Sequence, residues 1–279
     1  LNNGLSNTSV DNVKEISTIL KNSMSIIKDK FDASISLTGG VDSKMTLAAA
    51  SDTLEKFDYF SFISSTAESK DAIAAREICR HLSLSHTIYN VPDVETEIKN
   101  YYDIAKIIDH NSAYIKKYKS NELRKIIFLY INSNIKTEVK SHISEIGRAF
   151  YYKKLGKTEI PKSLQPRHMS NLYKRNMFNR RTLNFMDNAF KEFIHVTKFG
   201  DSFRNQYDES DMFYWEHRMS QWASLVKQDF DISHNTTIIY NNRNLLEKFL
   251  SFQLDSRIKD LPQNSIIQYL NPKIYHLDI

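Results

Sequence analysis

The sequence predicts an α/β fold in which a twisted parallel sheet with flanking helices comes first and a mostly helical half follows. Strand-like and helix-like segments alternate up to Val91, which is the pattern of right-handed βαβ units in a parallel sheet. A pair of glycines ends the first strand-like segment, at the edge where such sheets bind ligands. From Glu145 onward, apolar residues recur mainly with helical spacing.

Each element follows from the spacing of its apolar residues. The first 30 residues are predicted to form a helix, because five of them recur three or four positions apart: Val13, Ile16, Leu20, Met24 and Ile27. Strands are expected at 31–37, 57–63, 87–91 and 136–142. Further helices are expected at 44–50, 71–82, 94–131, 182–199, 209–228 and 244–254. Asn241 or Asn242 would cap the last of these helices.

The composition is that of an ordinary globular protein, with 41% apolar and 25% charged residues among 279. Only 6 Gly and 5 Pro are present, which argues against low-complexity linkers and turn-rich all-β folds. No apolar run reaches the roughly 18 residues of a membrane-spanning helix, so we expect no membrane partner. The single cysteine, Cys79, excludes an internal disulfide and fits a reducing, cytoplasmic compartment. The net charge of +5 permits attraction of anionic ligands.

The segment Thr38-Gly39-Gly40-Val41-Asp42-Ser43 joins the first predicted strand to a helix. We expect its glycines to take positive φ and to let a ligand approach the backbone. The helix N-terminus would offer unpaired N–H groups to phosphate, and Thr38 and Ser43 would add hydroxyl donors. Asp42 would repel a bare phosphate, which argues for a bridging Mg²⁺. The loop is neither a Walker A sequence nor a dinucleotide fingerprint, because the glycine spacings differ.

This loop resembles the pyrophosphate-binding loop, usually Ser-Gly-Gly-X-Asp-Ser, of the PP-loop ATP pyrophosphatases, whose α/β fold is HUP-like. The superfamily includes asparagine, β-lactam, NAD and GMP synthetases and tRNA-modifying ligases. The resemblance implies that ATP is cleaved between its α and β phosphates. AMP would pass to a carboxylate oxygen, and a nitrogen nucleophile would then displace it. Thr38, Gly39, Gly40 and Ser43 would hold the β and γ phosphates, and Asp42 would hold Mg²⁺.

Two more segments are similar to the synthetase domain of asparagine synthetase-like proteins. One is Phe213 to Arg218 with the later Tyr240 to Arg243; the other is Ser141 to Tyr151, where asparagine synthetases carry Ser-Gly-Glu-Gly-Ala-Asp-Glu. Two registers stay open for the second. In one, Glu145 is the catalytic glutamate and Arg148 replaces the metal-binding aspartate, where it would grip phosphate. In the other, Glu145 is a metal carboxylate beside Asp42.

The resemblance therefore implies an ATP-dependent, AMP-forming ligase that adenylates a small-molecule carboxylate and joins it to ammonia or an amine. Residues 1–150 would form the ATP-binding α/β region, and residues 151–279 the helical region that completes the domain. Cys79 lies in a predicted helix and is expected to be buried, so this chain alone could not draw ammonia from glutamine. The nitrogen would be free ammonia, an amine on a substrate, or ammonia from a glutaminase domain or subunit. The chain begins at Leu1, which leaves an upstream domain open. Lys227 and Lys259 are the candidates for the family's catalytic lysine.

Two alternatives remain beside this hypothesis. A tRNA-modifying enzyme is suggested by the nine basic residues and one acid between Lys153 and Arg181, with Tyr173 and Phe178 among them. A non-enzymatic nucleotide-binding module is suggested by Arg148 and the unassigned lysine. The main hypothesis needs no nucleic acid. Ser64 follows the second predicted strand, where relatives contact adenine or ribose, and is included among the ATP-binding residues.

Overall fold

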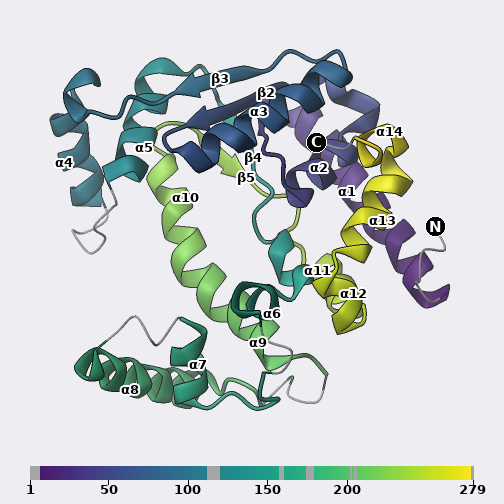
Figure 1. Ribbon diagram of the computed structural model, residues 1–279, viewed down its shortest axis with the longest axis vertical. Coiled ribbons are helices and arrows are strands. Elements are labelled where there is room, and N and C mark those ends of the chain that lie inside the picture. Colours follow the sequence, from purple (N-terminus) through teal and green to yellow (C-terminus); the bar gives the residue numbers. More distant parts are fainter. Residues whose placement is uncertain are drawn as a thin grey trace.

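The computed structural model describes residues 7–111, 120–156, 160–173, 179–201, 203 and 206–277. Its centre is a five-stranded, all-parallel sheet in the order β3-β2-β1-β4-β5 (Figure 1). The strands are β1 (Ala33–Ser36), β2 (Asp58–Ile63), β3 (Thr87–Asn90), β4 (Thr137–Val139) and β5 (Asn235–Thr237). Helices flank this sheet, so the predicted α/β class is confirmed.

The first half of the chain alternates strands and helices as predicted. Its helices are α1 (Asn7–Lys30), α2 (Val41–Ala49), α3 (Thr66–His81), α4 (Tyr101–Asn111) and α5 (Ser120–Asn132). Short 3₁₀ helices lie at Ser51–Lys56, Glu95–Glu97 and Ser144–Arg148. The side chain of Ser65 caps α3 by accepting a hydrogen bond from the backbone N–H of Glu68.

The second half is mostly helical. It contains α6 (Phe150–Leu155), α7 (Pro166–Leu172), α8 (Arg180–Thr197), α9 (Glu209–Phe213), a π-helix (Tyr214–Ala223), α10 (Ser224–Phe230), α11 (Arg243–Leu250), α12 (Leu254–Ile258), α13 (Leu261–Leu270) and α14 (Pro272–Tyr275). Asn242 is the cap of α11, since its side chain accepts from the backbone N–H of Leu245 at 3.2 Å. Helices α7 and α8 lie together at the end of the molecule far from the sheet (Figure 1).

Each face of the sheet is covered by its own apolar cluster, because successive strand residues point to opposite sides. Ile35 and Tyr59 face a cluster formed with α1, α2, α3, α11 and α13. Phe62 and Tyr89 face a second cluster that α4, α5 and α10 complete. A third cluster, rich in aromatic rings, holds α6 to α9, the π-helix and α11 together.

Strand β5 was not predicted from the sequence. It has only three residues, Asn-Thr-Thr, which carry no apolar alternation. It pairs with β4, and the neighbouring His234 reaches Glu138 of β4 through Nε2 and Oε2 at 2.8 Å. Helix α13, also from the second half of the chain, packs against α1 and α2. The division at residue 150 stays a prediction, but both halves contribute to one sheet and one core.

None of the helices in the part of the chain that the structure describes is long and apolar enough to cross a bilayer.

Candidate functional site

The strand order reverses at β1: the chain runs from β1 to β2 and β3 on one side, then returns to β4 and β5 on the other. Ligands of open parallel sheets bind at such a reversal, outside the carboxyl ends of the strands. A pocket lies there, between the segments that follow β1 and β4. Its walls include Thr38, Asp42, Ser43, Glu68, Asp71, Glu138, Lys140, Ser141, His142 and Glu145.

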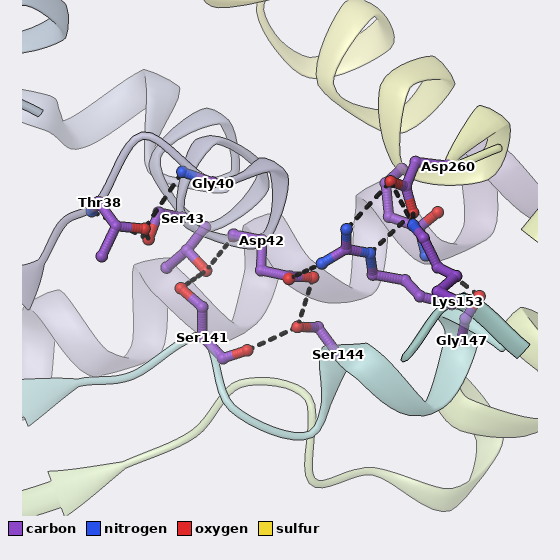
Figure 2. Close-up of polar contacts among 12 residues, drawn as sticks. Thr38, Gly40, Asp42, Ser43, Ser141, Ser144, Gly147, Lys153 and Asp260 are labelled. Carbon is purple, nitrogen blue, oxygen red and sulfur yellow. Dashed lines mark hydrogen bonds and ion pairs between the residues drawn. The ribbon is translucent and has the colours of Figure 1, made fainter. Parts of the chain in front are cut away.

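The segment Thr38 to Ser43 is held by its own hydroxyl groups. Thr38 Oγ1 accepts from Gly40 N at 3.2 Å, and Ser43 Oγ accepts from Thr38 N at 3.2 Å. The two hydroxyl oxygens are 3.0 Å apart (Figure 2). Thr38, Asp42 and Ser43 line the pocket, whereas Gly39, Gly40 and Val41 complete the turn behind them.

The expectation of positive φ in this loop was wrong. Gly40 has φ −70° and ψ 154°, and the only described glycines with positive φ are Gly156 and Gly200. The reason for glycine at position 39 is space instead, because a Cβ there would come within 2.8 Å of the Cβ of Ala74 in α3. The turn therefore lies directly against α3. No side chain caps α2, so its first N–H groups remain available to an anion.

The segment after β4 is tied to this loop by hydroxyl groups. Thr46 Oγ1 in α2 lies 2.7 Å from Ser141 Oγ and 2.9 Å from the hydroxyl of the fully buried Tyr240. Ser144 Oγ donates either to the Ser141 carbonyl at 2.6 Å or to Asp42 Oδ1 at 2.8 Å (Figure 2). The glycine loop, the segment Ser141 to Tyr151 and Tyr240 of the third segment thus meet here.

The backbone of this second segment is strained. Ile143 has φ 78° and Ala149 has φ 49°, so left-handed residues stand on both sides of the 3₁₀ helix Ser144–Arg148. A β-branched residue in that region is a genuine outlier, and such strain tends to gather at functional sites. The strain fixes the direction in which Glu145 and Arg148 leave the backbone.

Arg148 lies between two aspartates. Its Nη1 donates to Asp42 Oδ2, and its Nε and Nη2 donate to the two carboxylate oxygens of Asp260 at 2.7 and 3.0 Å. Lys153 Nζ also reaches both oxygens of Asp260, each at 2.6 Å (Figure 2). Burial raises the pKa of Asp42 above its usual value, although Arg148 and the Ser144 hydroxyl oppose that effect.

Glu145 lies near the same carboxylate. Burial, followed by repulsion from Asp42, raises the pKa of Glu145 to about 7. Its Oε2 atom is buried and has no hydrogen-bond partner. The structure therefore brings together Asp42, Glu145 and Arg148, the three residues on which the two sequence registers differed.

Two carboxylates, one with an orphaned buried oxygen, fit a divalent cation that also binds phosphate oxygens. Among the described residues no group of three or more His, Cys, Asp or Glu side chains is placed to hold a metal by itself. A magnesium ion at Asp42 and Glu145 would thus depend on oxygen ligands from a nucleotide or water. The residues fit a metal that arrives with ATP better than a permanently held one.

Two lysines lie on the His142 side of the site: Lys140 lines the pocket, and Lys227 contacts His142. Lys227 Nζ is 3.2 Å from His142 Nδ1, and burial, then the charge of Lys140, lowers the pKa of Lys227 to about 8. Burial and the two lysines lower the pKa of His142 to about 3, so that imidazole is neutral at pH 7. Lys259, the other predicted candidate, is exposed on the surface after α12.

Lys140 was missed by sequence reasoning. It is buried, lies 2.9 Å from Glu138 Oε2 and 4.0 Å from the centre of the Phe230 ring, and lines the pocket. Its position near the end of the strand predicted at 136–142, close to the edge where ligands bind, was the available signal.

The predictions for Ser64 and Cys79 have different outcomes. Ser64 does not line the pocket: its backbone N–H and hydroxyl both donate to Glu68 Oε2, at 2.8 and 2.6 Å. Glu68 lines the pocket in its place, so a nucleotide contact of Ser64 stays a prediction. Cys79 is fully buried in α3, and burial raises the pKa of its thiol to about 12. It is therefore a packing residue, as expected.

The two aromatic residues of the basic segment have different outcomes. Tyr173 packs against Phe190 and His217 in the aromatic cluster, with its hydroxyl 3.0 Å from Nδ1 of His217. Phe178 lies outside the described residues. Stacking of a nucleic-acid base on this segment stays a prediction.

Gly147→Ala is expected to lower the free energy of unfolding by about 1–3 kcal/mol, the usual cost of overpacking. A Cβ at Gly147 would come within 2.8 Å of Phe249, a fully buried ring of α11. Urea titration would measure the loss. Gly156→Ala is a useful contrast, because nothing lies within 4 Å of its Cβ and only its φ of 59° opposes the change. An undiminished stability of Gly147→Ala would mean that the Ser144–Arg148 turn does not pack on α11 as described.

The chain was compared with known proteins once this geometry was clear. The model of the asparagine synthase family matches residues 20–118, which include β1 to β3 and the loop Thr38 to Ser43. A search of curated proteins gives no match. The family match and the fold confirm the predicted resemblance to an asparagine synthetase-like domain of the PP-loop ATPase superfamily.

Proposed function

We propose that this chain, with its asparagine synthase-like ATP-binding region, is an AMP-forming ligase that adenylates a carboxylate and forms an amide or related C–N bond. The family supports ATP-dependent amidation, and the particular reaction is our proposal. One observation carries it: the glycine loop, Glu145 and the cation Lys140 line one pocket at the strand reversal, where Arg148 donates to Asp42.

In this proposal ATP lies over the carboxyl ends of β1 and β4. Thr38, Gly39, Gly40 and Ser43 would hold the β and γ phosphates, with help from the N-terminus of α2. The Thr38 and Ser43 hydroxyls, which bond to each other in the structure, would turn toward phosphate oxygens. Val41 keeps the turn in shape behind them.

Asp42 and Glu145 would hold Mg²⁺ together with phosphate oxygens, and the bound ion would neutralise phosphate charge. A carboxylate oxygen of the substrate attacks the α phosphorus, the bond to the β-phosphate oxygen breaks, and pyrophosphate leaves. Arg148, a fixed fork of donors beside Asp42, would stabilise that leaving charge. In the second step an amine nitrogen attacks the acyl carbon, AMP leaves, and the nitrogen loses a proton to a base. In the alternative register, where Asp42 and the phosphates hold Mg²⁺ without Glu145, Glu145 would be that base.

Lys227 is our choice for the catalytic lysine. It contacts the neutral His142, which lines the pocket, whereas Lys259 is exposed. A half-buried ammonium group there would orient the acyl adenylate. Ammonia would come from solution or from a glutaminase domain or subunit, because the buried Cys79 cannot serve as a glutaminase nucleophile. The buried thiol also fits a cytoplasmic protein.

The test is to incubate the protein with MgATP and a panel of carboxylic acids, with hydroxylamine as the nucleophile. AMP, pyrophosphate and an acyl hydroxamate are expected in equal amounts. Formation of ADP and phosphate would contradict the proposal. ATP binding without AMP formation across the panel would favour a nucleotide-binding module. The tRNA-modifying alternative would be favoured if AMP formed only when tRNA was added and if tRNA binding weakened as salt was raised.

A further inference from the structure

The aromatic side of the site contains an arginine that the proposed chemistry does not use. We propose that Arg218 binds an anionic group, a carboxylate or a phosphate, at the non-reacting end of the acid substrate. The inference rests on the proposed function and names the kind of acid that the ligase accepts. Phe150, Tyr173 and Trp222 form the walls of this subsite, which we name the Arg218 subsite.

Arg218 stands on an unusual helix. The ten residues Tyr214–Ala223 form a π-helix between α9 and α10. Helices with i to i+5 bonding are rare, and they are frequently found at functional sites. Tyr214, Arg218 and Trp222 follow at intervals of four and come to lie along one side of this helix, beside Phe150.

The guanidinium group of Arg218 is surrounded by rings. Its Cζ lies 5.4 Å from the centre of Phe150, 5.8 Å from Tyr173 and 5.2 Å from Trp222. Its Nε is buried and has no hydrogen-bond partner. The hydroxyls of Tyr173 and Tyr214 are its polar neighbours.

The guanidinium group of Arg218 has no counter-charge among the described residues. Across the described part of the chain, no carboxylate lies within ion-pair distance of Arg218. The other arginines near the core differ in this respect: Arg257 pairs with Asp211, and Arg148 pairs with Asp42 and Asp260. Aromatic faces offset only part of the cost of a partly buried cation. A guanidinium fork held in this way is ready for a bidentate carboxylate or phosphate.

The Arg218 subsite lies beside the ATP pocket. The centre of the Trp222 ring is 6.2 Å from that of His142, and His142 lines the pocket. End to end, the separations of 6.2 and 5.2 Å place the guanidinium carbon at most 11.4 Å from the His142 ring. An acid of amino-acid to sugar-acid size spans such a distance while its other end reaches the adenylation centre.

The charge of the surroundings also selects an anion. Lys227 lies on the neighbouring side of the same helical stretch and points to His142. The substrate thus meets two cations and several ring faces. We infer an acid that carries a second anionic group on a flat or apolar frame.

Trp222 provides a direct readout, because it forms a wall of the subsite and is 44% exposed. In a Trp215→Phe background it is the single tryptophan of the chain. Benzoate and phenyl phosphate serve as anionic probes, and benzamide is the uncharged match for benzoate. We expect one or both anions to quench the fluorescence of Trp222 saturably. The probe that binds more tightly shows whether the subsite prefers a carboxylate or a phosphate.

Arg218→Gln should weaken that binding at least 10-fold, while Arg80→Gln, which removes an exposed arginine paired with Glu77, should leave it unchanged. Arg218→Lys keeps the charge but loses the fork, so it should also weaken binding if Arg218→Gln does not fold. Equal affinity in both Arg218 variants and the parent, or no quenching by either anion, would overturn the inference. ATP binding and AMP formation are measured separately on the same proteins, so failure of the Arg218 subsite is distinguished from failure of the ligase proposal.

Discussion

Asp42→Asn is expected to reduce the rate of pyrophosphate release by about 10²–10³-fold, the usual loss when one preorganised electrostatic group is removed from a reacting centre. Asp42 joins three functions of the site. It receives the Ser144 hydroxyl and Arg148, it lies at the start of α2, and it is the carboxylate that would share a cation with Glu145. The amide would keep the size of the side chain and remove its charge. Quenched-flow or coupled pyrophosphate assays at saturating MgATP would measure the effect.

Asp52→Asn is the matched control, because Asp52 is an exposed aspartate whose partner is Lys21. Its rate should stay within twofold of the parent. The Asp42→Asn variant should keep its fold, since Arg148 still has the two oxygens of Asp260. An unchanged rate of pyrophosphate release in a folded Asp42→Asn variant would rule out the assignment of the phosphate site.

Arg257→Met is expected to lower the free energy of unfolding by about 3–5 kcal/mol, the cost of leaving a buried charge without its partner. Arg257 Nη1 and Asp211 Oδ2 are 2.7 Å apart, and both side chains are almost completely buried, at 5% and 3% exposure. Arg257 Nε also donates to the carbonyl of Phe252 at 3.1 Å. The pair joins α9 to α12 and so holds the aromatic cluster against the end of the core. Denaturant titration at pH 8 would measure the loss.

The pH dependence of the stability that Arg257→Met loses identifies the cause of that loss. Burial raises the pKa of Asp211 to about 6, even though Arg257 opposes the shift. A carboxyl whose pKa is higher in the folded state destabilises the fold as pH rises from its unfolded pKa of 3.8 through about 6. Without Arg257 the opposing attraction is lost, so the deficit of the Arg257→Met variant should be smaller at pH 5 than at pH 8.

Two further variants complete this experiment. Arg257→Met combined with Asp211→Leu removes both charges and should recover most of the stability, because a well-packed apolar pair often replaces a buried ion pair. Arg243→Gln breaks the exposed Arg243–Glu247 pair and should cost about 0.5 kcal/mol or less. A deficit that is the same at pH 5 and pH 8, and that persists in the double variant, would show that Arg257 acts through packing alone.

The sheet and its ligand edge could be predicted because they depend on local patterns. Strands β1 to β4 have apolar alternation or buried runs, and the glycine loop stands at the end of one of them. Strand β5 gave no such pattern, because three polar residues join the sheet through pairing with β4 and not through their own apolarity. Edge strands of this length are fixed by tertiary contacts.

The residues of the site could be predicted, but the contacts between them could not. The family resemblance assigned roles to Asp42, Glu145 and Arg148, but their contacts depend on a reversal of strand order and on left-handed residues such as Ile143 and Ala149. The role of Asp260 in this network had no sequence signal, because it lies 112 positions from Arg148. The expected positive φ at the glycines failed for the same reason, since the need for glycine at position 39 comes from Ala74 of another helix.

The packing of α1 against α11 and α13 has a consequence for synthesis of the chain on the ribosome. The apolar stripe of α1, which includes Ile16 and Leu20, is made before α11 and α13 and is fully covered only when residues beyond 260 have been added. Contacts between segments so distant in sequence form late, because loop closure must come first. The nascent polypeptide therefore exposes a helical apolar face until α13 has been made, which makes α1 the natural place for a chaperone to bind.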